Sequence, residues 1–150
     1  MKLPANLARG VAYVLNEALY LSVTNKAPCR GLIATRGPSF VMPAASGFSL
    51  LPEGDEHEPS AADLASIIDA VYSDLEIVGM GENDAGVSFT GAGDPLLRID
   101  TVLETVDLVK QRRHGVGFNV TTSGLFDPSF PAALKAGGVK NITVALNAAD

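Results

Sequence analysis

The sequence predicts an α/β fold in which about four parallel strands alternate with three helices. Short segments rich in β-branched and aromatic residues alternate with segments whose apolar residues recur every three or four positions, which favours right-handed βαβ units. Trp is absent and aromatic residues are only 6% of the chain, so Val, Leu, Ile and Ala must fill the core. Such a core suits strands that are covered by helices. At 150 residues the chain is long enough for one domain and short for two, so residues 1–150 are expected to form a single domain.

The first expected strand, residues 19–24, follows an N-terminal extension, residues 1–17, and consists mainly of residues that favour strands. A long loop is expected over residues 37–59, which contain four prolines and three glycines. A loop of this length inside a compact domain is usually functional or bound to a partner. We therefore expect an ordered excursion or an interaction loop here.

A helix is expected to begin after Ser60, because Asp63 follows three residues later in a pattern related to the capping box. Its core-facing stripe recurs at three- and four-residue spacing and consists of Leu64, Ile67, Ile68, Val71 and Leu75. The remaining expected elements are a strand at 86–90, a helix at 99–112, a strand at 116–121, a helix at 128–136 and a strand at 142–146. Gly137 and Gly138 mark the end of the last helix.

Composition and charge exclude several classes of protein. The chain carries 11 basic and 17 acidic residues, a net charge of −6, so a surface for nucleic acids or anionic membranes is not expected. The single cysteine, Cys29, excludes an internal disulfide framework and a metal site made of several cysteines. No apolar run approaches the roughly 20 residues of a membrane span. The N-terminus lacks a secretory signal pattern, so a cytoplasmic protein is expected, with an organellar presequence as the alternative.

Small polar residues and glycines follow each of the expected strands. Thr24 and Asn25 follow the first, the segment GAGDP (91–95) follows the second, TSG (122–124) follows the third and Asn147 follows the fourth. In parallel α/β folds, ligands bind at the carboxyl ends of the strands. We therefore expect a binding site, if there is one, at this edge of the sheet.

Four segments carry a resemblance to a known family: LSVTNKAPCRGLIA, FTGAGDPLLRIDTVLE, FNVTTSGLF and ITVALNAAD. In this order and at this spacing they resemble the core of the radical S-adenosylmethionine (SAM) proteins, in particular the TatD-associated branch. The resemblance covers about residues 18–150 and implies a partial (half) TIM-like barrel. In the family, three cysteines spaced C-x3-C-x2-C after the first strand hold a [4Fe-4S] cluster, and a glycine-rich segment after the second strand contacts the methionine amino group of SAM.

Carried over to this sequence, the resemblance implies a cofactor-binding set of six residues: Gly91, Gly93, Asp94, Thr122, Ser123 and Asn147. Asp94 stands where the family usually has Glu. The three cluster-ligand positions, however, are occupied by Ala27, Gly31 and Ala34, none of which can coordinate iron. Cys29 lies between two of them, and a single thiolate cannot hold a cluster that needs three cysteines. No cluster and no other metal site is therefore expected, and SAM binding is left as an alternative.

Each of these residues also has a structural interpretation. Gly91 and Gly93 equally suit a tight turn from the strand into its helix. Asp94 before Pro95 equally suits a helix cap. Thr122 and Ser123 suit a turn, and Arg98, near the same edge, suits a solvated charge or an anion contact. His57 and His114 have no spaced metal-ligand partner and are expected at the surface. The sequence leaves these alternatives open.

The leading hypothesis is a degenerate, truncated radical-SAM-like domain without its cluster and without catalytic residues, which acts as a structural or interaction component of a larger assembly. The sequence ends soon after the fourth expected strand, whereas the family usually has about six. A protein partner or self-association is therefore expected to cover the edge of this strand. Two alternatives are a SAM- or nucleotide-binding protein without radical chemistry, and an active radical SAM enzyme whose cluster cysteines were altered in this sequence.

Overall fold

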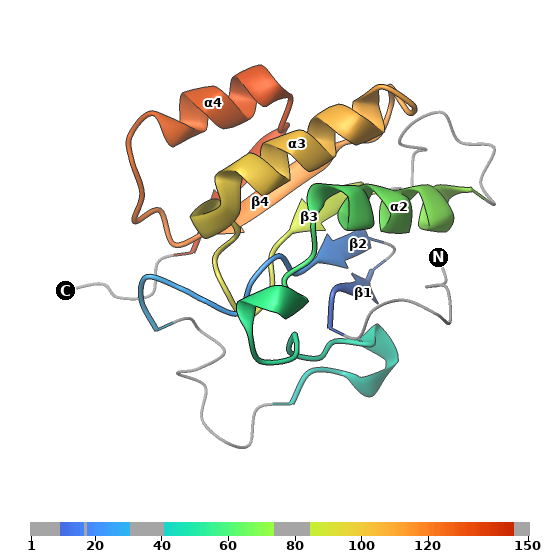
Figure 1. Ribbon diagram of the computed structural model, residues 1–150, viewed down its shortest axis with the longest axis vertical. Helices are drawn as coiled ribbons and strands as arrows, with labels where there is room; N and C mark the ends of the chain where they lie inside the picture. Colours follow the sequence, from blue (N-terminus) through green and yellow to red (C-terminus); the bar gives the residue numbers. More distant parts are fainter. Residues whose placement is uncertain (1–9, 17, 31–40, 74–84, 146–150) are drawn as a thin grey trace.

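The computed structural model describes residues 10–16, 18–30, 41–73 and 85–145 (Figure 1). Five strands form one sheet in the order β1-β2-β3-β4-β5. The strands are β1 (Ala12–Leu15), β2 (Ala18–Leu21), β3 (Val87–Phe89), β4 (Phe118–Thr122) and β5 (Asn141–Val144). β1 and β2 are antiparallel, and the other three neighbouring pairs are parallel. The predicted α/β class is confirmed, and the sheet is mostly parallel, but it has five strands and one antiparallel pair where about four parallel strands were predicted.

The antiparallel strand β1 lies in the segment that the sequence assigned to an N-terminal extension. Asn16, with φ at 49°, lies in the turn that returns the chain into β2. An aromatic contact holds the hairpin, because Tyr13 stacks on its cross-strand partner Tyr20 with ring centroids 5.1 Å apart. Phe48, from the long loop, meets Tyr13 edge-on at 5.0 Å. Pairing and packing therefore make β1 a strand, although the local sequence pattern did not indicate one.

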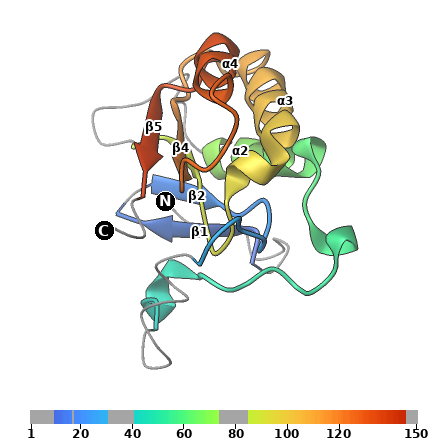
Figure 2. The same cartoon turned by 90° about the vertical axis from the view of Figure 1, so that its left-hand side faces the viewer.

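Three α-helices among the described residues cover one face of the sheet: α2 (Ala61–Tyr72), α3 (Ile99–Lys110) and α4 (Phe130–Gly137) (Figure 2). Three short 3-10 helices accompany them, η1 (Ala44–Ser46) and η2 (Asp55–His57) in the long loop and η3 (Pro95–Arg98) before α3. The predicted capping box is confirmed at the start of α2, and the same hydrogen bonds from Ser60 lower the pKa of Asp63. α4 ends at Gly138, whose φ of 98° is the left-handed conformation that glycine adopts readily.

The core lies between the sheet and these helices. The helix-facing side chains of the three central strands are fully buried, and Val102, Val106 and Val109 of α3 are buried against them. Leu64, Ile67, Ile68 and Val71 of α2 are buried as the periodicity predicted, whereas Leu75 lies outside the described residues. Within the described part of the chain, no helix has the length and apolar character needed to cross a membrane.

An ion-pair cluster joins the ends of α2 and α3. Asp69 of α2 accepts hydrogen bonds from Arg112 at 2.6 Å and from Arg113 at 2.9 Å, both just past the end of α3. Arg113 also donates to the backbone carbonyls of Tyr72 and Asp69, near the end of α2. Partial burial raises the pKa of Asp69, but the hydrogen bonds from Arg113 and Arg112 outweigh this effect and hold it below its ordinary value.

Candidate functional site

Three of the six predicted cofactor-binding residues meet at the carboxyl edge of β3 and β4. Asp94 follows β3, and its Oδ2 atom accepts hydrogen bonds from the Thr122 hydroxyl at 2.9 Å, the Ser123 backbone N–H at 2.7 Å and the Ser123 hydroxyl at 2.8 Å. Asp94 is 5% exposed and Thr122 is 4% exposed. The prediction that these residues lie together is confirmed, and they form a contact that we call the Asp94 clasp (Asp94, Thr122 and Ser123).

The carboxylate of Asp94 accepts four hydrogen bonds from the protein itself. Its Oδ1 atom accepts the backbone N–H of Leu96 at 3.1 Å, so Asp94 also caps η3, the turn that leads into α3. An ionised carboxylate accepts about four hydrogen bonds, and four protein donors contact this one. Oδ2 accepts three of these hydrogen bonds and Oδ1 accepts one, and the group is buried, so little of the carboxylate is left for the ammonium group of a ligand.

The two glycines of this motif stand where other chain segments come close. A Cβ atom on Gly93 would collide with the backbone carbonyl oxygens of Thr24 and Lys26, in the loop after β2. The Asp94 backbone N–H donates to the same Lys26 carbonyl at 2.8 Å. Gly93 therefore permits a close backbone approach that fastens the loop after β2 to the start of η3.

Gly91 lies against Ser22, a residue that the sequence analysis did not select. A Cβ atom on Gly91 would collide with the Ser22 hydroxyl, which is buried and has no hydrogen-bond partner among the described residues. A buried hydroxyl without a partner is uncommon, because its desolvation is then uncompensated. The one signal in the sequence that could have pointed to Ser22 is its position directly after β2.

A second polar cluster, next to the clasp, joins the long loop to the same edge. Glu58 accepts the Thr24 hydroxyl at 2.6 Å and pairs with Arg98 at 3.5 Å. Arg98 donates to the backbone carbonyls of Val23 and Pro59, each at 2.8 Å. Arg98 is thus held by three protein acceptors, while 23% of its side chain stays exposed.

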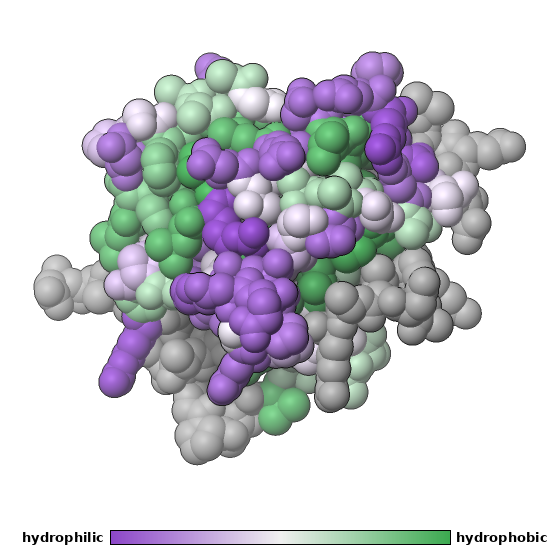
Figure 3. Space-filling view, viewed as in Figure 1, coloured by the Kyte–Doolittle hydropathy of each residue, from purple (hydrophilic) through white to green (hydrophobic). Residues whose placement is uncertain are grey.

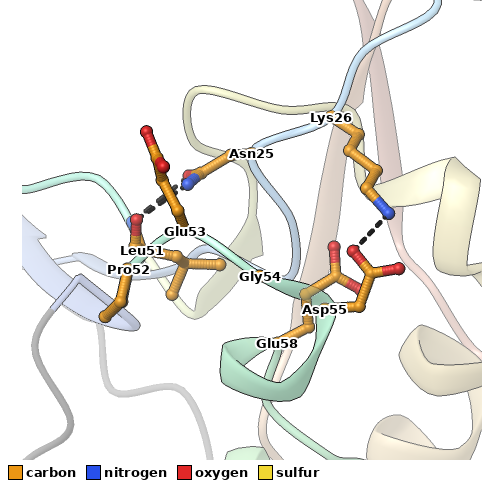
Figure 4. Close-up of a pocket in the computed structure, with 8 residues that line it drawn as sticks. All are labelled: Asn25, Lys26, Leu51, Pro52, Glu53, Gly54, Asp55 and Glu58. Carbon is orange, nitrogen blue, oxygen red and sulfur yellow. Dashed lines mark hydrogen bonds and ion pairs between the residues drawn. The ribbon is translucent and has the colours of Figure 1, made fainter.

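The long loop also forms a small hollow of about 190 Å³ beside this cluster (Figure 4). Asn25 fixes one wall, since its side-chain amide donates to the Leu51 carbonyl at 2.8 Å and accepts the Leu51 backbone N–H at 3.2 Å. Lys26 pairs with Asp55 at 2.6 Å on the other side, and this hydrogen bond raises the pKa of Lys26. Figure 3 shows hydrophilic residues gathered over this part of the surface. Within the described part of the long loop, residues 41–59, the regular elements are the two short helices η1 and η2.

The segment after β2, where radical SAM proteins carry their three cluster cysteines, has only Cys29 and does not fit a [4Fe-4S] cluster. Ala27 is exposed and has no donor atom, and Cys29 is half-buried. Gly31 and Ala34 lie outside the described residues, but neither residue type offers a thiolate to a cluster. Asn147, one of the predicted cofactor-binding residues, also lies outside the described residues. Over the described ranges, His, Cys, Asp and Glu side chains form no group of three that could hold a metal ion, and His57 and His114 are exposed.

No protein-family model, curated protein or solved structure matches this chain. The resemblance to radical SAM proteins therefore stays a prediction that depends on the four sequence segments.

Proposed function

We propose that the chain is a non-catalytic interaction component built on a radical-SAM-like frame, a partial TIM-like barrel that holds no cluster. The observation that supports this proposal is the buried carboxylate of Asp94, which accepts four hydrogen bonds from the protein itself. At the position where the family binds the amino group of SAM, this chain uses its carboxylate to join β3, β4 and η3. The cluster-ligand positions of the family, which hold residues such as Ala27 in place of cysteine, also support the proposal.

The proposed interaction role is supported by β5, which lies at the other end of the sheet from the β1–β2 hairpin. β5 is one of the two edge strands of the sheet, and all four of its residues are exposed. Parallel strands are normally covered on both faces, and an uncovered edge with apolar side chains promotes association. We propose that this edge is the contact with a protein partner in an assembly.

Anaerobic reconstitution with ferrous iron and sulfide tests the absence of a cluster. The wild-type chain should stay colourless and retain no stoichiometric iron after desalting. The matched variant restores the three cysteines, Ala27→Cys, Gly31→Cys and Ala34→Cys together, and should gain about four irons per chain if the frame is radical-SAM-like. Stoichiometric iron on the wild type would refute the proposed function, and a triple variant without iron would refute the resemblance.

A second candidate function is the binding of SAM or a related nucleotide without radical chemistry. The observation that favours it is the Ser22 hydroxyl beside Gly91, which has no hydrogen-bond partner in the described part of the chain, because a ligand atom could supply that bond. Calorimetric titration with SAM decides between the two functions. Binding by the wild type that weakens in Ser22→Ala would support this candidate, whereas no heat at about millimolar SAM would exclude it.

A further inference from the structure

The helices cover one face of the sheet (Figure 2), and neutral polar side chains line the centre of the other face. Side chains alternate between the two faces along a strand, and the helix-facing ones of β3 are buried Val and Phe. On the other face, the register places one residue from each of four strands in a row: Tyr20, Ser88, Asn119 and Asn141. A second row, two residues further along β4 and β5, consists of Thr121 and Thr143. We call these six residues the polar face.

The two amides of the first row are already fixed by hydrogen bonds. The Asn141 Nδ2 atom donates to Asn119 Oδ1 at 2.8 Å. The Asn119 Nδ2 atom donates to the Ala85 carbonyl at 3.3 Å and to Ser88 Oγ at 3.5 Å. Because these bonds order the amides before any ligand arrives, a ligand that contacts them loses less affinity to side-chain ordering.

Several hydrogen-bonding groups of the polar face have no partner among the described residues. These groups are the Ser88 O–H, the Oδ1 atom and second amide hydrogen of Asn141, and the hydroxyls of Thr121 and Thr143. None of the four residues is buried. Adjacent strands are about 4.8 Å apart and the two rows about 7 Å apart, so these groups cover an area of about 10 by 7 Å.

Tyr20 closes one end of this area with a face of its ring. Tyr13 stacks on the ring from the β1 side, with centroids 5.1 Å apart and an interplanar angle of 16°, and Phe48 packs on Tyr13 in turn. Ser88 is the cross-strand neighbour of Tyr20 on the β3 side. Its small side chain allows a ligand ring to lie against Tyr20 there.

We infer that the polar face binds a neutral oligosaccharide of at least two sugar rings. One ring lies against Tyr20 above Ser88, since the C–H groups on the face of a sugar suit the negative face of an aromatic ring. The next ring exchanges hydrogen bonds with Asn141 and Thr143. Tyr20 and Asn141 are three strands apart, about 14 Å, which a disaccharide spans and a single ring does not.

The hydrogen-bonding chemistry of the polar face favours a sugar over an apolar partner surface. A sugar hydroxyl both donates and accepts, as do the side-chain hydroxyls and amides of these two rows. An apolar surface would bury the same groups unpaired, which is costly. The polar face therefore suits a ligand that is covered with hydroxyl groups.

Charge restricts the ligand to a neutral one. The chain carries a net charge of −6, and the polar face has no Lys or Arg that could pair with a phosphate or a carboxylate. It also has no Asp or Glu, whereas glycoside hydrolysis commonly uses a pair of them. The polar face would thus bind an oligosaccharide without cleaving it. This inference adds a binding activity to the proposed function and does not depend on the absence of a cluster.

NMR titration of the isotope-labelled full chain with cellobiose, maltose and lactose tests the inference. The side-chain amide signals of Asn119 and Asn141 should shift with at least one of these disaccharides, with a Kd of about a millimolar, as expected for a shallow site. Methyl β-glucoside, which has one ring, should bind about fivefold more weakly. Adenosine, a neutral ligand of another class, should leave these signals unchanged.

Two reciprocal substitutions in β5 give a matched variant and control. Thr143→Val removes a hydroxyl from the polar face at constant shape and should weaken binding about fivefold, the contribution of one hydrogen bond. Val144→Thr adds a hydroxyl at the next position, which shares the helix-bearing face with Thr122, and should leave binding unchanged. Tyr20→Leu removes the ring and should weaken binding about tenfold. Circular dichroism verifies that each variant is folded, and Thr143→Val tests the site even if Tyr20→Leu is not.

The absence of any shift with these disaccharides at about 50 mM would overturn the inference. So would binding that is equally strong in wild type and Thr143→Val, because the sugar would then lie elsewhere. Adenosine that shifts the Asn119 and Asn141 amides where no disaccharide does would replace the sugar with a nucleoside. None of these results would touch the proposed function, which fails separately if the wild type retains iron.

Discussion

Asp94→Asn should destabilise the protein strongly in a measurement made without added ligand. The substitution keeps the size of the side chain but replaces one acceptor oxygen with an NH2 group, so either the Leu96 N–H or the donors from Thr122 and Ser123 must face another donor. It also removes the charge that strengthens all four hydrogen bonds. A charge-assisted hydrogen bond contributes about 1.5–3 kcal/mol, and a buried unpaired donor costs about 1–3 kcal/mol. We expect a loss of about 3 kcal/mol.

Urea unfolding followed by circular dichroism measures this loss. With a slope of about 2 kcal/mol per molar urea, the midpoint should fall by about 1.5 M. Asp127→Asn is the matched control, because Asp127 also accepts the backbone N–H two residues ahead, from Ser129, but is exposed. Its midpoint should stay close to that of the wild type.

An Asp94→Asn protein that is as stable as the wild type, or more stable, would refute the structural role of this carboxylate. Functional residues are often held at a cost to stability, so their replacement commonly stabilises a protein. That result would favour the ligand-binding interpretation of Asp94 and would call for the SAM titration to be repeated with this variant.

Two further substitutions test the framework around this edge and the helix layer. Gly93→Ala should lower the free energy of unfolding by about 2–3 kcal/mol, because the added methyl group would meet two backbone carbonyls. Gly137→Ala is the control, since its methyl group would meet only the flexible end of the Leu103 side chain. Equal urea midpoints for the two variants would contradict the prediction. Asp69→Asn should cost about 1 kcal/mol at pH 7. Because the pKa of Asp69 is lowered from 3.8, this contribution is present above that value and is lost as the pH falls through the lower folded pKa. The difference from wild type in urea midpoint should therefore shrink below about pH 3, and a pH-independent difference would contradict it.

Local sequence signals predicted most of the elements because those signals are themselves local. The Ser60–Asp63 capping box acts within one turn, and the core stripe of α2 depends only on helical periodicity. The start of α3 at Ile99 and the glycine end of α4 follow in the same way. β1 was missed because its stability comes from pairing with β2 and from the contact of Tyr13 with Phe48, a residue 35 positions away.

The candidate site divides in the same way. The order of the strands was enough to predict that Asp94, Thr122 and Ser123 share one edge of the sheet, since parallel strands bring their carboxyl ends together. Whether Asp94 binds a ligand or caps a helix could not be predicted, because a carboxylate at this position in the chain suits either role. Glu58 and Ser22 were also missed, since their contacts with Arg98 and Gly91 join segments far apart in the sequence.

The sequence by itself determined the α/β class, the places of the helices, the acidic surface and the absence of cysteines at Ala27, Gly31 and Ala34, because composition and periodicity carry these properties directly. Only the tertiary structure decided that the Asp94 carboxylate accepts hydrogen bonds from Thr122 and Ser123, because these residues are 28 and 29 positions away in the sequence and the chain between them leaves the distances undefined. The exposure of β5 was likewise decided by the position of the strand at the edge of the sheet.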